Sequence, residues 1–168
     1  MATDGTEGAD WVIGAGAETR ELVIVSAAYA VLTFLMALPF SLHSGSQVVA
    51  DAPDTHLYIW TLAWDAHAFL HQPLAIFDAN IYYPFANTLA YSENLIGSAF
   101  FAAPILWLTG NMVLAMNLTA FTTCVLCGTG AFLLARRLHV SATGAFICGL
   151  IFAFAPPRFF RLGQLHMT

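Results

Sequence analysis

Long apolar runs without any charged residue alternate with polar stretches along the chain. Three of these runs are candidate membrane spans, at about residues 22–42, 111–135 and 140–157. As a helix rising ~1.5 Å per residue, the first would reach about 31 Å, enough to cross a bilayer core. Pro156-Pro157 ends the third run, because a helix interior tolerates proline poorly. The pattern predicts an all-α, multi-pass membrane protein with about three transmembrane helices.

A fourth apolar run, at about residues 94–109, is too short to be an ordinary span. From Leu95 to Thr109 it carries Pro104 and would reach only ~23 Å as a helix. We place this run at or partly within the membrane interface. An arrangement with four spans stays open, because the three-span and four-span arrangements both place three arginines on the cytoplasmic side and two on the other side.

The composition supports the prediction of a membrane protein. Hydrophobic residues make up 59% of the chain and charged residues 9%, with a mean hydropathy of +0.73, whereas soluble domains carry about 25% charged residues. The net charge is −5 and lysine is absent. No basic patch is present to neutralise phosphates, which argues against nucleic acid as a partner. The expected partner is a lipid bilayer.

The segment between the first two predicted spans, residues 43–110, is the most polar part of the membrane domain 22–168. Its first part, 43–94, contains five acidic residues and no Lys or Arg, whereas Arg20 precedes the first span. Because positively charged flanks stay in the cytoplasm, we expect a mobile cytoplasmic tail over residues 1–21 and an extracytoplasmic loop at the plasma (inner) membrane.

Within this loop, residues 55–71 have the pattern of a helix lying on the membrane surface. At ~100° per residue, an aromatic arc is separated from an apolar arc by a polar seam that includes Asp65. The aromatic arc contains His56, Trp60, Trp64, His67 and His71. His67 and His71 have metal-ligand spacing, but we interpret them as interfacial packing residues because no helical Glu accompanies them. The run at 94–109 would form a second interfacial helix.

Asp54, just before this helix, is the main candidate for chemistry. A carboxylate there can act as a general base on a hydroxyl or hold a metal ion, and it can equally cap the helix. Asp51 stands three residues earlier, a spacing at which the two carboxylates could share a divalent cation. Glu93 precedes the second interfacial run and can either cap it or contact a substrate.

A second polar group follows the third predicted span. Arg158 and Arg161, with Gln164 and His166, form the only cluster of arginines on the extracytoplasmic side in the three-span arrangement. Arginine suits bidentate phosphate binding, and anchoring at lipid headgroups is the alternative. Cys124 and Cys127 have the spacing of a redox motif, but they lie inside an apolar run and we interpret them as packing residues.

Taken in this order, the features resemble the start of the GT-C superfamily of membrane glycosyltransferases. The most similar members are bacterial enzymes of the protein-mannosyltransferase-like and lipid-A-sugar-transferase-like kinds. The resemblance runs from about Leu22 to the end of the chain. The segments that carry it are Asp51-Ala-Pro-Asp54-Thr-His-Leu-Tyr58, Asn80-Ile-Tyr-Tyr-Pro84, Leu108-Thr-Gly-Asn111, Leu133-Leu-Ala-Arg-Arg-Leu138 and Phe152-Ala-Phe-Ala-Pro156. Many relatives have Glu after the loop Asp, where this chain has Thr55.

The resemblance implies transfer of a sugar from a polyprenyl-phosphate donor to an acceptor hydroxyl on the extracytoplasmic face. It implicates Asp54 as base, and Arg158 or Arg161 near the lipid phosphate. Such enzymes have eight or more spans, so we expect this chain to be the N-terminal portion of a longer enzyme and inactive by itself. The alternative function is that of a non-catalytic multi-pass membrane protein, either a scaffold or a transporter component.

Overall fold

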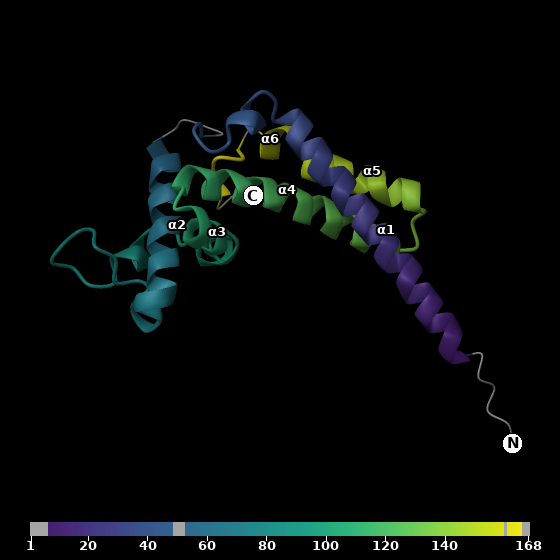
Figure 1. Ribbon diagram of the computed structural model, residues 1–168, viewed down its shortest axis with the longest axis horizontal. Coiled ribbons are helices and arrows are strands. Elements are labelled where there is room, and N and C mark those ends of the chain that lie inside the picture. The colour runs from purple at the N-terminus through teal and green to yellow at the C-terminus, as the bar shows by residue number, and fades with distance from the viewer. Residues whose placement is uncertain (1–6, 49–52, 160, 166–168) are drawn as a thin grey trace, which may run out of the picture.

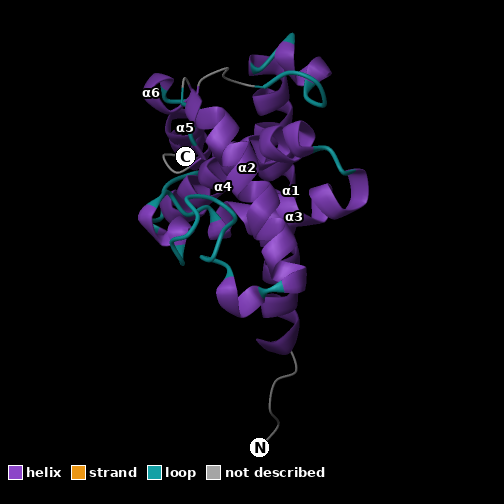
Figure 2. Cartoon of the chain, turned by 90° about the vertical axis from the view of Figure 1, so that its left-hand side faces the viewer, coloured by secondary structure: helices purple, strands orange, loops and turns teal. Residues whose placement is uncertain are grey.

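The computed structural model describes residues 7–48, 53–159 and 161–165, with side chains described from residue 18 onward except at Pro53. All regular structure in these ranges is helical (Figure 2), which confirms the predicted all-α class. The α-helices are α1 (Glu7–Met36), α2 (Pro53–His71), α3 (Ile96–Thr109), α4 (Met112–Arg137), α5 (Ala142–Ala153) and α6 (Pro156–Phe159). Short 3₁₀ helices occupy Phe40–His43, Pro73–Ala75 and Thr88–Tyr91.

Among the described residues, two helices are long and apolar enough to cross a membrane. They are the 19-residue part of α1 from Glu18 to Met36 and all 26 residues of α4. The third predicted span is shorter than expected, because α5 has 12 residues and ends at Ala153. The residue before a proline avoids helical geometry, so the paired prolines at 156 and 157 prevent one helix from covering 140–157.

The first helix also differs from its prediction at both ends. It begins at Glu7, so residues 7–21, expected to form a mobile tail, are helical and continuous with the apolar part. It ends at Met36 rather than near Leu42. Pro39 lies just beyond this end, and since it has no backbone N–H and fixes its own φ, the chain continues as turns and a 3₁₀ helix.

Helices α1, α4 and α5 pack together around Tyr29, which is fully buried. Its hydroxyl donates a 2.9 Å hydrogen bond to the carbonyl of Phe146, and its ring stacks on the Phe146 ring at 5.1 Å. Gly128 of α4 and Gly149 of α5 face the same tyrosine. Small residues of this kind let helix backbones approach closely, which is how membrane helices commonly associate.

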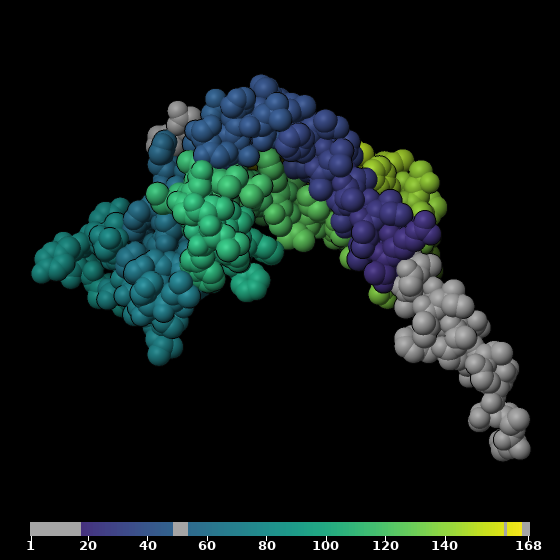
Figure 3. Space-filling model, in the orientation of Figure 1, coloured from purple at the N-terminus to yellow at the C-terminus, as the bar shows by residue number. Residues whose placement is uncertain are grey.

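Helices α2 and α3 match the two predicted interfacial segments in extent and lie at one end of α4. Figure 1 shows α2 running across this end, and α3 is seen nearly end-on beside it, so neither follows the direction of α4. The indole N–H of Trp107 joins α3 to α2 by donating to the Ala66 carbonyl at 3.1 Å. The loop after α2 projects from this end, away from α4, while α1 arches over α4 (Figure 3).

Buried polar contacts attach the turn after α1 to α4. Asn117 is fully buried in α4, and its amide donates to the carbonyls of Ser44 and Gln47, both at 2.7 Å. Asn111 caps α4 by accepting from the Leu114 N–H, and its amide donates to the Gly45 carbonyl at 2.8 Å. These contacts hold the turn after α1 against the first part of α4.

Candidate functional site

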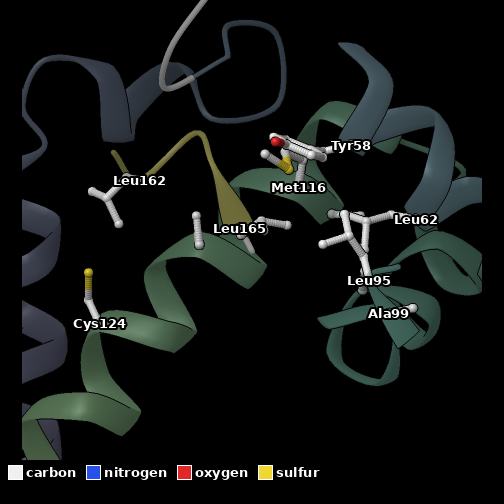
Figure 4. Close-up of a cluster of buried hydrophobic side chains, with 11 residues drawn as sticks. Tyr58, Leu62, Leu95, Ala99, Met116, Cys124, Leu162 and Leu165 are labelled. Atoms are coloured by element: carbon white, nitrogen blue, oxygen red, sulfur yellow. The ribbon is translucent and has the colours of Figure 1, made fainter. Parts of the chain in front are cut away.

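A hydrophobic cluster at the α2 end of α4 brings four parts of the chain together (Figure 4). Tyr58 of α2 packs near Met116 of α4, and Leu165, from the last described segment, lies beside them. The buried members are Tyr58, Leu62, Leu95, Ala99, Ala102, Ala115, Met116, Ala120, Cys124, Leu162 and Leu165. The cluster therefore holds α2 against α4 and draws the end of the chain to the same place.

Tyr58 joins two of the predicted site residues, Asp54 and Glu93. It is 1% exposed, and its hydroxyl donates a hydrogen bond to the Glu93 carboxylate. Burial, then this hydrogen bond and the charges of Glu93 and Asp54, raise the pKa of Tyr58 above its usual value. The hydroxyl is thus kept protonated and fixes the Glu93 carboxylate near the start of α2.

Asp54 lies in the first turn of α2 and is exposed to solvent. Because α2 begins at Pro53, Asp54 lies inside the first turn rather than at the predicted N-cap position. The helix dipole stabilises a carboxylate there, which is compatible with a chemical role. Asp51, predicted to act beside Asp54, and His166, predicted in the arginine cluster, lie outside the described residues. In the described part of the chain, no group of three or more His, Cys, Asp or Glu side chains could hold a metal ion.

The predicted arginine cluster begins within α6, where Arg158 lies, and the chain then returns along α4. The Arg158 guanidinium donates to the Cys127 sulfur at 2.8 Å and lies 5.7 Å from the centre of the Phe152 ring. Leu162 is near Cys124, and Leu165 is closer to Met116 (Figure 4). Positions 116, 124 and 127 lie on one side of a helix. The segment from Arg158 to Leu165 therefore runs along that side toward Tyr58.

The two arginines differ in their surroundings. Arg158 is half-buried beside the middle of α4, where its cation–π contact with Phe152 stabilises the charge. Arg161 is exposed and donates to the Gln164 side chain at 3.3 Å. Of the two, Arg161 is the one accessible to a ligand that approaches from the surface.

Asp65 is the residue that sequence reasoning missed. We predicted it in a polar seam between the two arcs of α2, but it is 0% exposed and neither carboxylate oxygen has a hydrogen-bond partner among the described residues. Burial raises the pKa of Asp65 from 3.8 to about 6. The sequence did contain a sign of this burial. Asp65 is seven residues after Tyr58, and at ~100° per residue this spacing puts both on the same side of α2.

The aromatic arc predicted on α2 is confirmed by a row of ring contacts. Trp60 stacks with Trp64 at 6.2 Å, Trp64 meets His67 at 5.9 Å, and His67 stacks with His71 at 4.2 Å. The Trp64 indole N–H donates to the Ile76 carbonyl at 2.8 Å, which fixes one end of the projecting loop.

No protein-family model, curated protein or solved structure matches the chain. The resemblance to GT-C glycosyltransferases therefore stays a prediction.

Proposed function

We propose that this chain is the N-terminal portion of an integral-membrane glycosyltransferase. It would move a sugar from a polyprenyl-phosphate donor to an acceptor hydroxyl on the extracytoplasmic face of the membrane. The supporting observation is that one hydrophobic cluster at the α2 end of α4 contains residues from the segments of both predicted groups. The charges of Asp54 and Glu93 act on its member Tyr58, and Leu162 and Leu165, which follow the two arginines, belong to the same cluster.

The proposed membrane arrangement has α1 and α4 as full spans and α5 followed by α6 as a broken third span. Exposed apolar side chains cover α1, among them Val23, Ile24 and Val31, and in this arrangement they face lipid. Helices α2 and α3 lie in the interface, in agreement with their position across the end of α4 (Figure 1). Phe100, Trp107 and Leu108 of α3 are exposed and would enter the lipid headgroup region.

In the proposed reaction, Asp54 removes the proton from the acceptor hydroxyl as its oxygen attacks the anomeric carbon of the sugar. The bond between that carbon and the phosphate oxygen breaks, and polyprenyl phosphate leaves with the electron pair. Arg161, and Arg158 deeper along α4, balance the charge of the phosphate. Glu93, held by its hydrogen bond with Tyr58, would orient the acceptor by hydrogen bonding.

A divalent cation could also be held in this region. Asp54 and Glu93 offer carboxylate oxygens, the ligands that hard cations prefer, and Asp51 would be a further ligand. Such an ion would supply positive charge near the donor phosphate. The residue roles given above do not depend on it.

Replacing Asp54 with Asn tests the proposal in the full-length gene product. We expect D54N to lower the release of polyprenyl phosphate from polyprenyl-phosphate sugars by about 100-fold or more, because general-base catalysis contributes 10²–10⁴-fold. Membrane vesicles carrying equal amounts of each protein would be assayed with a panel of hexose and pentose donors. Asp78→Asn is the matched control, since Asp78 is an exposed acid in the projecting loop, and it should retain turnover.

Two outcomes would count against the proposal. Equal turnover by D54N and the unaltered protein would remove Asp54 from the chemistry. Absence of donor turnover in the unaltered full-length protein would favour the non-catalytic alternative, a scaffold or transporter component.

A further inference from the structure

The last two turns of α2 present two imidazole rings side by side. His67 and His71 are both exposed, and their rings stack with centroids 4.2 Å apart and planes inclined by 14°. Two histidines one helical turn apart are the simplest arrangement by which a helix can offer two nitrogen ligands to one ion. Here the side chains already occupy neighbouring positions.

A backbone hydrogen bond fixes the state of one of these rings. The Nδ1 atom of His71 lies 2.9 Å from the His67 carbonyl oxygen. A carbonyl can only accept, so Nδ1 carries the hydrogen and, in the neutral ring, Nε2 keeps its lone pair. Metal-binding histidines commonly donate the other ring N–H to a carbonyl in this way, which orients the ring and increases its basicity.

A pocket of ≈ 240 Å³ between α2 and α3 adjoins the pair. His67 and His71 form its polar part, and Leu70, Leu106 and Trp107 form apolar walls. The hydrogen bond from Trp107 to the Ala66 carbonyl holds the α3 wall in place. An ion bound to the two imidazoles would therefore have an ordered wall on one side and open coordination positions on the other.

The charge of this region favours a cation over an anion. Between Arg20 and Arg136 the sequence contains no Lys or Arg, whereas it contains Asp65 in the same helix and Asp78 in the loop that follows. A negative field of this kind raises the local concentration of cations. Because no third His, Cys, Asp or Glu completes a group with the pair in the described residues, water or a ligand would fill the other positions.

We propose that His67 and His71 bind one divalent transition-metal ion of the class that imidazole prefers, represented by Zn²⁺ and Cu²⁺. Both ions would be held through Nε2 at ~2.0–2.1 Å. The His67 ring reaches this geometry by rotating out of the stack, while the His71 ring keeps its hydrogen bond to the His67 carbonyl. The site is separate from Asp54 and does not rest on the proposed glycosyl transfer.

Metal titration of the purified full chain, carried on a tag without histidine, tests this site. We expect binding of Zn²⁺ at one ion per chain, with the affinity lowered about tenfold or more by either His67→Ala or His71→Ala. His43→Ala and His139→Ala are matched controls, because both remove exposed histidines from other regions, and they should leave the affinity unchanged. Circular dichroism of each variant would establish that its helices are intact.

Electron paramagnetic resonance with Cu²⁺ gives a second readout that a change in folding would not imitate. The unaltered chain should show coupling to two imidazole nitrogens, and each single variant should lose one of them. Equal Zn²⁺ affinities for the unaltered chain and the H67A/H71A double variant would overturn the proposal. A two-nitrogen spectrum that persists in both single variants would also overturn it.

Discussion

Replacing Gly149 with Ala is expected to destabilise the packing of α1, α4 and α5 by about 3 kcal/mol, the upper part of the usual range for overpacking. A Cβ atom at position 149 would collide with the Tyr29 hydroxyl and would lie 2.5 Å from the Gly128 carbonyl oxygen. The Tyr29 hydroxyl cannot easily move, because it donates to the Phe146 carbonyl, and the Gly128 oxygen belongs to the backbone of α4. Unfolding in detergent micelles with a rising fraction of SDS would measure the change.

Gly130→Ala is the matched control for this prediction. Gly130 also lies within a packed helix, but a Cβ there meets nothing within 4 Å. Alanine should stabilise α4 slightly at that position, because glycine costs about 1 kcal/mol in a helix interior. Adding Tyr29→Phe to Gly149→Ala should recover part of the loss by removing the colliding hydroxyl. If Gly149→Ala is as stable as Gly130→Ala, the three helices are not packed as described.

Replacing Asp65 with Asn should stabilise the fold above about pH 6 and have little effect below pH 4. Burial raises the pKa of Asp65 from 3.8 to about 6, so the folded state prefers the protonated carboxyl. The contribution of Asp65 to stability is therefore most favourable below its pKa in the unfolded state, and it is lost as pH rises through its pKa in the folded state. At 1.36 kcal/mol per unit, this shift corresponds to about 3 kcal/mol at pH 8, which the neutral amide of Asn avoids.

Unfolding of D65N and of the unaltered chain at pH 4 and pH 8 would measure this effect. Asp78→Asn, which changes an exposed acid, should give no comparable dependence on pH. A stability difference that is the same at both pH values, or that is larger at pH 4, would show that Asp65 is not buried as a lone carboxyl.

The positions of the helices were largely predictable from local sequence. The apolar arc from Tyr58 to Leu70 and the break at Pro73 defined α2, and Gly110, which takes a left-handed φ of 66°, ends α3. The run predicted as the third span is not one continuous helix, for a physical reason. A charge-free run shows that a segment is apolar, but a continuous helix also needs backbone hydrogen bonds, which Pro156 and Pro157 interrupt.

The arrangement of the candidate site depended on contacts that local patterns do not contain. Asp54 was predictable from its place at the start of a helix, but the hydrogen bond between Tyr58 and Glu93 depends on the path of the projecting loop, which is held by contacts such as that of Trp64 with Ile76. Burial of Asp65 results from the packing of other segments against α2. The chemical roles of Asp54, Arg158 and Arg161 stay predictions until the activity is measured.

The shortness of α5 has a consequence for the surrounding lipid. At ~1.5 Å per residue its 12 residues extend about 18 Å, well below the ~30 Å thickness of a hydrocarbon core. In the proposed arrangement, the non-helical backbone after Ala153 and the Arg158 guanidinium would then occupy the depth of one leaflet. Acyl chains there would meet hydrogen-bonding groups, so we expect that leaflet to be locally dimpled and hydrated beside α6. Such a dimple would shorten the distance that a lipid-linked phosphate travels to reach the protein.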